Sequence, residues 1–165
     1  MLVAVLLFAA VFTMPTAQLS SNDLAWNDFD AGLKKSRASG KPMIVDFYAD
    51  WCSWCKVMDE KTFSNPGIRK ILKDKFVLVR IDVEKNQQIT YDGRKFSTKE
   101  FQAYMRVSGL PTLAFFDKQG KPITLLPGFV EPRQLEHILG YISSECYTRQ
   151  VTFEQYVAAD GKCIK

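Results

Sequence analysis

Two cysteines separated by two residues, Cys52 and Cys55, are the residues in this chain best suited to chemistry. They follow an apolar run at 42–49 that is typical of a buried strand, and they precede a helix-compatible segment at 57–63. At the first turn of a helix, both sulfur atoms lie on one side and can form a disulfide. The free N–H groups and the positive end of the helix dipole favour a thiolate there. The pattern predicts thiol–disulfide exchange by a partly exposed nucleophile with a resolving thiol beside it.

Two other uses of a Cys-x-x-Cys pair are weaker here but remain open. A zinc site needs four ligands, usually from a second close pair. The other cysteines, Cys146 and Cys163, are far apart in the sequence, and His137 is the only histidine. A purely structural disulfide is disfavoured because so short a bridge restricts little chain entropy. We therefore expect a redox pair, with no metal and no cofactor.

Composition describes an ordinary globular chain. Its 165 residues are 47% hydrophobic, enough for one compact domain with its own core. The net charge of +4 is spread among acidic and basic residues, so nucleic-acid binding gains no support. We expect a monomer.

The first twenty residues carry no charge, and the stretch 2–14 is almost wholly apolar. This stretch is too short to span a bilayer comfortably and is typical of the core of a secretory signal, cleaved between Ala17 and Ser21. No basic residue precedes it, so an uncleaved membrane anchor stays open. Either way, residues 1–20 predict an exported domain in an oxidising compartment, where disulfides persist.

The rest of the chain alternates helix and strand patterns. Asn27 is expected to cap a helix that ends at Gly40, before the strand at 42–49. After the cysteines we expect a helix beginning at Asn65-Pro66, a strand at 76–83, a hairpin turning at Asp92-Gly93 and a helix capped by Ser97. Strands at 113–116 and 123–126 should follow. The chain should then form a helix from Pro132, whose apolar stripe reaches Cys146, and a short helix from Thr152. The main domain would occupy residues 21–147, and residues 148–165 would form a tail.

Three stretches in this order resemble the thioredoxin superfamily. They are 45–52, Cys55-Lys56 and 107–112, and the resemblance covers about 28–144. It implies an α/β thioredoxin fold, a central mixed sheet flanked by helices, with a hairpin and helix inserted before the strand that follows a cis-proline. Lys41-Pro42, the helix at Asn65-Pro66 and the insertion at Asp92-Gly93 are also similar to exported thioredoxin-like reductases of the SoxW type. The same helix and spacing resemble soluble domains that carry electrons for periplasmic disulfide reduction.

The resemblance implies a role for each matching residue. Cys52 would be the attacking thiolate and Cys55 the resolving thiol. Asp46 matches a buried carboxylate that manages a cysteine proton, and burial should raise its pKa toward neutrality. Pro111 matches a cis-proline that lets substrate backbone pair near Leu110, and cis bonds before proline are uncommon. From the residues alone, a solvent-reaching Asp46 and a trans Pro111 stay open.

The chain departs from the family at two places. The lysine that usually neighbours the buried carboxylate has no clear match, because Leu78 falls at that position and Arg80 lies two residues further on. The dipeptide between the cysteines is Ser53-Trp54, which leaves the redox direction open. We expect Trp51, Ser53 and Trp54 to contact substrates, with packing of Trp54 against the inserted hairpin as the alternative.

The second cysteine pair poses a separate question. Cys146 lies on an apolar stripe, so a buried free thiol is one reading. Cys163 lies in a polar tail, and the even cysteine count in an oxidising compartment favours a structural bridge between the two. Such a bridge would stabilise the fold by about 3 kcal/mol in the chain-entropy model.

Together these features predict an exported thiol–disulfide oxidoreductase that reduces disulfides in exported cysteine-containing proteins. The resemblance implies an integral-membrane electron-transfer protein as its reductant. One alternative is the reverse chemistry, a disulfide oxidase or isomerase. The other is a non-enzymatic adaptor or chaperone whose cysteines stay bridged.

Overall fold

The computed structural model describes residues 24–164, so the signal or anchor expected at residues 1–20 lies outside the described residues. The strands are β1 (Trp26–Asn27), β2 (Met43–Tyr48), β3 (Val77–Asp82), β4 (Gln88–Tyr91), β5 (Arg94–Ser97), β6 (Thr112–Phe116) and β7 (Pro122–Pro127). The helices are α1 (Phe29–Ser39), α2 (Ser53–Val57), the π-helical turn η2 (Met58–Phe63), α3 (Pro66–Lys75), α4 (Thr98–Tyr104), α5 (Pro132–Ser143), the 3₁₀ turn η3 (Cys146–Arg149) and α6 (Phe153–Ala158). No helix within residues 24–164 has the length and apolar character needed to cross a bilayer.

Five strands form the central sheet in the order β1-β3-β2-β6-β7. β1, β3 and β2 run parallel, while β6 is antiparallel to β2 and β7 is antiparallel to β6. The mixed sheet and the parallel β2–β3 pair confirm the sequence prediction. The short β1 was not predicted, because two residues carry too little periodicity to indicate a strand.

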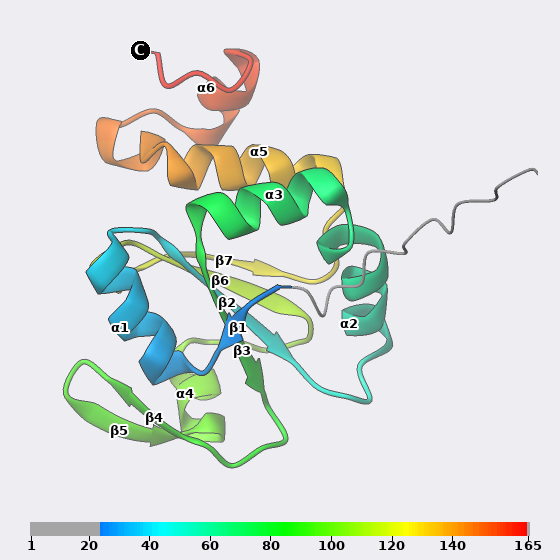
Figure 1. The fold of residues 1–165 in the computed structure, drawn as a ribbon, viewed down its shortest axis with the longest axis vertical. Helices are drawn as coiled ribbons and strands as arrows, with labels where there is room; N and C mark the ends of the chain where they lie inside the picture. The colour runs from blue at the N-terminus through cyan, green and yellow to red at the C-terminus, as the bar shows by residue number, and fades with distance from the viewer. Residues whose placement is uncertain (1–23, 165) are drawn as a thin grey trace, which may run out of the picture.

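The two faces of the sheet bury separate hydrophobic clusters, and helices cover both faces (Figure 1). One face packs against α1, α4 and the hairpin through residues that include Phe29, Phe101 and Phe96. The other packs against α3 and α5 through residues that include Leu72 and Leu139. Because β2 and β6 are covered on both sides, their residues are apolar almost without interruption, as buried central strands require.

The start of α1 differs from the prediction by one residue. Asp28 caps the helix, with its Oδ1 accepting the N–H of Ala31 at 2.8 Å. Asn27 belongs to β1 instead, and its amide donates to the carbonyl of Leu78 at 2.8 Å. Both residues are good caps, and the pairing of β1 with β3 decides which one serves. The helix ends as expected at Gly40, whose φ of 67° suits glycine.

The hairpin β4–β5 and helix α4 form the predicted insertion before β6. Asp92 and Gly93 both have positive φ, as a two-residue hairpin turn needs. Ser97 and Glu100 form the expected capping box of α4. The hairpin has its own two-stranded sheet and packs on α1 and α4, so it extends one face of the domain without entering the central sheet (Figure 1).

The C-terminal segment corrects one prediction. Helix α5 ends at Ser143, and Glu145 then adopts a φ of 52°, so Cys146 lies in the separate turn η3 and does not continue the stripe of α5. Its full burial comes from packing against the short C-terminal helix α6. The capping box of Thr152 and Gln155 begins α6 as expected.

Candidate active site

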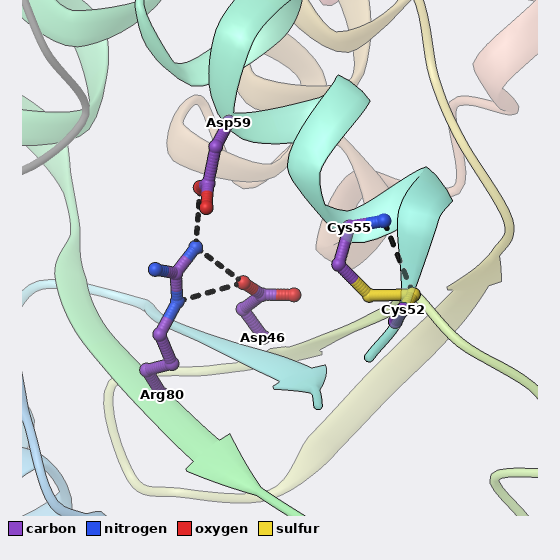
Figure 2. A network of polar contacts seen from close by, with 5 residues as sticks. All are labelled: Asp46, Cys52, Cys55, Asp59 and Arg80. Carbon is purple, nitrogen blue, oxygen red and sulfur yellow. Dashed lines mark hydrogen bonds and ion pairs between the residues drawn. A yellow bond between two sulfur atoms is a disulfide. The ribbon is translucent and has the colours of Figure 1, made fainter. Parts of the chain in front are cut away.

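The two close cysteines form a disulfide at the point where β2 gives way to α2. Cys52 is the N-cap residue of α2, and its sulfur accepts the backbone N–H of Cys55 at 3.1 Å (Figure 2). An N–H group aimed at this sulfur stabilises negative charge on it once the bond is reduced. The helix that begins here therefore favours Cys52, and not Cys55, as the thiolate.

Both cysteines are buried, and the nucleophile Cys52 is more buried than predicted. Cys52 is 4% exposed and Cys55 is 6% exposed, whereas the sequence predicted a partly exposed nucleophile. In the disulfide each sulfur covers the other, and Ala49 and Leu110 pack against the pair. Little more than the edge of the disulfide is therefore open to an attacking thiol from a partner.

A cis peptide bond joins Leu110 to Pro111, directly before β6. The loop is held by two hydrogen bonds: the hydroxyl of Thr112 donates to the carbonyl of Gly109 at 2.7 Å, and the N–H of Gly128 donates to the carbonyl of Pro111 at 2.7 Å. Pro111 is buried, while half-buried Leu110 packs against the cysteine cluster. The loop thus lies against the disulfide.

Two tryptophans next to the cysteines are among the most exposed large apolar residues of the described chain. Trp51 is 67% exposed and Trp54 is 58% exposed. The Trp54 ring lies 5.8 Å from the ring of Phe129, which follows β7. The alternative in which Trp54 packs against the inserted hairpin was therefore wrong. Ser53, between the cysteines, is also exposed.

A buried carboxylate, Asp46, lies on β2 and forms an ion pair with Arg80, its register partner on β3. Asp46 is 2% exposed, so the alternative of a solvent-reaching side chain was wrong. The Nε and Nη2 atoms of Arg80 both approach Oδ2 of Asp46, at 3.0 and 2.9 Å. Nη2 also donates to Oδ1 of Asp59 on η2 (Figure 2). Two carboxylates therefore share one guanidinium.

The remaining oxygen of Asp46 has no hydrogen-bond partner among the described residues. Figure 2 shows this Oδ1 pointing away from Arg80, toward the side on which the disulfide lies. Burial raises the pKa of Asp46 to about 6, with Arg80 acting against that rise and Asp59 adding to it. A carboxyl group with such a pKa can exchange a proton near neutral pH.

Aromatic rings hold Arg80 in place. Its guanidinium carbon lies 4.4 Å from the ring centroid of Trp26 and 4.7 Å from that of Tyr48. Sequence reasoning did not assign Arg80 a role, although it noted its distance from the expected lysine position. The available signal was an arginine between apolar residues of a predicted strand, but its partner depends on the β2–β3 register.

The second cysteine pair also forms a disulfide, between Cys146 on η3 and Cys163 after α6. Cys146 is fully buried, and Val151 and Tyr156 pack against it. This bridge therefore ties the chain after α6 to the end of α5. Within residues 24–164, no three His, Cys, Asp or Glu side chains cluster in a way that could hold a metal ion.

Comparisons with known proteins agree with this geometry. A family model for thioredoxin-like domains matches residues 29–143. The thiol:disulfide interchange protein DsbD of Vibrio vulnificus is 38% identical over 109 residues, which make up 64% of this chain and 17% of the relative. DsbD of Escherichia coli K12 is 38% identical over 96 residues, or 57% of this chain and 15% of the relative. The chain thus corresponds to only a small part of these longer proteins.

Solved structures share the fold. A thioredoxin-fold protein from Helicobacter pylori superposes with a TM-score of 0.62 at 22% identity, covering 73% of this chain and 80% of the other. A thioredoxin from Thermus thermophilus gives 0.57 at 25% identity, covering 84% and 94%. The oxidised C-terminal domain of Neisseria meningitidis DsbD gives 0.52 at 21% identity, covering 72% and 99%. Because the family model spans most of the chain and the fold agrees with it, this chain belongs to the thioredoxin-like family and is a thiol–disulfide oxidoreductase domain.

Proposed function

We propose that this domain works in an exported compartment as a reductase of disulfides in partner proteins, with Cys52 as nucleophile. The observation that carries the proposal is the position of the Cys52–Cys55 bond at the start of α2, with an N–H on the Cys52 sulfur and the Leu110–Pro111 loop against it. The nucleophile, the resolving thiol and a surface for an extended substrate thus come together in one place.

The reaction proceeds by two exchanges. The Cys52 thiolate attacks one sulfur of the substrate disulfide, forms a mixed disulfide, and releases the other substrate sulfur as a thiolate that takes up a proton. Cys55 then gives up its proton and attacks the Cys52 sulfur, which releases the second substrate thiol. Asp46, whose free oxygen faces this side, is the proposed acceptor of the Cys55 proton. Two electrons have moved to the substrate, and the Cys52–Cys55 disulfide has formed.

The charges near the disulfide favour reduction over oxidation of substrates. Strongly oxidising members of this superfamily stabilise their thiolate and hence their reduced form. Here Asp46 and Asp59 share the single guanidinium of Arg80, so the cluster is net negative when both are ionised. A negative cluster disfavours a nearby thiolate, so the reduced form gives up its electrons more readily.

A reductase in an oxidising compartment needs a supply of electrons. We propose that a membrane electron-transfer protein re-reduces the disulfide, and that exported cysteine-containing proteins are the substrates. The DsbD relatives are named thiol:disulfide interchange proteins, which supports an exchange partner of this kind. The apolar stretch near the start of the chain, as a secretory signal or an anchor, supports the location.

Two measurements test the direction. Equilibration with glutathione and dithiothreitol buffers should give a reduction potential nearer to thioredoxin than to the oxidant DsbA, which differ by about 150 mV. Insulin reduction with dithiothreitol should be fast for the wild type and at background for Cys52→Ser. A DsbA-like potential would replace the reductase with an oxidase, and equal insulin rates for the two proteins would favour an adaptor. Trapping with Cys55→Ser would then identify the bound partners.

A further inference from the structure

We propose that Arg80 and Asp59 are positioning residues for Asp46: Arg80 holds one carboxylate oxygen, and Asp59 limits that hold by sharing the guanidinium. Together they would set the pH at which Asp46 exchanges a proton with the thiols. This inference rests on the proposed function for its role in turnover, but its central claim concerns the carboxyl group of Asp46 itself.

The contacts divide the two oxygens of Asp46 between two tasks. Both Arg80 contacts, at 3.0 and 2.9 Å, fall on Oδ2. Oδ1 is buried and has no hydrogen-bond partner among the described residues. In Figure 2 the carboxyl group lies between Arg80 and the cysteine pair, with Oδ1 on the cysteine side. Arg80 thus fixes the orientation of the carboxyl group and leaves one oxygen free for a proton.

Arg80 cannot itself take part in the proton exchange. A guanidinium stays charged throughout the pH range of a folded protein, so it supplies a fixed positive charge. Its side chain is 17% exposed and packs against the rings of Trp26 and Tyr48, so it cannot readily turn away. The proton therefore resides on Asp46 or on a sulfur.

Asp59 has the opposite effect on the same carboxyl group. It lies on the π-helical turn η2, directly after α2, and accepts a hydrogen bond from Nη2, the nitrogen that also contacts Asp46. Its negative charge partly cancels the guanidinium as seen by Asp46. Removing Arg80 and removing Asp59 should therefore move the titration of Asp46 in opposite directions, which a general loss of packing would not do.

Few other groups face Asp46. β3 contributes Arg80, η2 contributes Asp59 and α2 contributes the cysteine sulfurs. Its register partner on β6 is the apolar Leu113. The buried residues of α5 are apolar, and those of α3 are apolar apart from Arg69. Tyr48, on the same strand, contacts the cluster through the guanidinium of Arg80, which lies over its ring.

The direct test is a carbon-13 NMR titration of the Asp46 carboxyl in the oxidised protein, in which no active-site thiol titrates. Arg80→Met should move the Asp46 midpoint upward by about one pH unit or more, and Asp59→Asn should move it downward by up to about one unit. Arg80→Lys keeps the charge without the two-point contact and should fall between wild type and Arg80→Met. Unmoved midpoints, or shifts in the same direction, would overturn the proposal.

Asp59→Asn keeps the test open if Arg80→Met does not fold, because Asp59 is 28% exposed and does not fill the core. The link to turnover is tested with pre-reduced protein and insulin across pH 5 to 8. The two substitutions should shift the rate profile in the directions seen by NMR, and both shifts should vanish in an Asp46→Asn background. Shifts that persist there would mean that Arg80 and Asp59 act on the thiols directly, which refutes the role in turnover. An oxidising potential would refute the proposed reductase and leave the NMR result standing.

Discussion

The two disulfides of this domain share one kind of bond but have contrasting surroundings. Cys52–Cys55 spans a sequence separation of 3, lies at the start of a helix, and has exposed tryptophans on both sides of Ser53. The ion-paired side chains of Asp46, Arg80 and Asp59 lie beside it (Figure 2). Cys146–Cys163 spans a separation of 17 and packs into an apolar and aromatic cluster with Val151 and Tyr156. The first has what exchange needs, and the second has what a cross-link needs.

The contrast shows that the surroundings of a disulfide, and not the bond alone, indicate its use. Exchange requires a stabilised thiolate, a nearby proton acceptor and access for a partner. A cross-link requires a long enclosed loop and packing that keeps the chain ends together. If the two bonds are as separate in function as they are in structure, removing one should leave the role of the other intact.

The largest expected effect is on catalysis. Cys52→Ser should reduce insulin reduction to the uncatalysed background, because a serine hydroxyl can neither be oxidised to a disulfide nor attack one. The matched variant, with Cys146→Ala and Cys163→Ala together, should retain most of the wild-type rate. Loss of most activity in the second variant would mean that the two disulfides are coupled, which contradicts their separate roles in catalysis and cross-linking.

Stability should show the reverse pattern. Removing the Cys146–Cys163 bridge should lower the free energy of unfolding by about 3 kcal/mol, since it releases the long loop in the unfolded chain. Urea denaturation of the double alanine variant measures this loss. Reduction of Cys52–Cys55 alone should cost less, because its loop is so short. A larger cost for the short bridge would contradict the assignment of the long one as the structural cross-link.

The buried carboxyl group of Asp46, next to the active disulfide, should make the stability of the domain depend on pH. The pKa of Asp46 is raised from 3.8 to about 6 in the folded protein. Between these values the folded state binds more protons than the unfolded state, so the free energy of unfolding falls as pH rises and then levels off above the folded pKa. At 1.36 kcal/mol per pH unit, this difference of about two units amounts to about 3 kcal/mol.

Asp46→Asn should remove this dependence. The variant should match the wild type near pH 4 and exceed its stability at pH 7, and the amide oxygen can still accept from Arg80. Urea denaturation at pH 4 to 7 gives the free energy of unfolding of both proteins. Groups that titrate alike in the two proteins cancel when one free energy is subtracted from the other. A variant less stable than the wild type at pH 7 would show that the Arg80 ion pair outweighs the cost of burying Asp46.

Much of this arrangement could be predicted from the sequence where the signal is local. The hairpin followed from Asp92-Gly93, the capping boxes from residue pairs three apart, and the position of the cysteines from the end of an apolar run. In each case the residues that decide the structure are neighbours in the chain, so no knowledge of distant contacts was needed.

Features that depend on distant parts of the chain were missed. The cap of α1 went to Asp28 because β1 pairs with β3, and the end of α5 before Cys146 depends on packing against α6. The Asp46–Arg80 pair follows from the register between two strands. Trp54 packs on Phe129, more than seventy positions away in the sequence. A tertiary contact decides each of these, and none leaves a periodic pattern in a single sequence.

The smallest expected effect concerns the exposed rings beside the active disulfide. Trp54 is 58% exposed and contacts Phe129, so Trp54→Ala should change the free energy of unfolding by about 1 kcal/mol or less. If the ring docks partner proteins, the variant should reduce insulin several-fold more slowly and reduce a small disulfide such as hydroxyethyl disulfide at the wild-type rate. Tyr104→Ala, which removes a 47% exposed ring packed against the hairpin residue Phe96, is the matched control and should change neither rate. If Trp54→Ala slowed the reduction of both substrates equally, the ring would act on the disulfide itself and not on the docking of partners. The reactivity of Cys52–Cys55 would then depend on packing as much as on access.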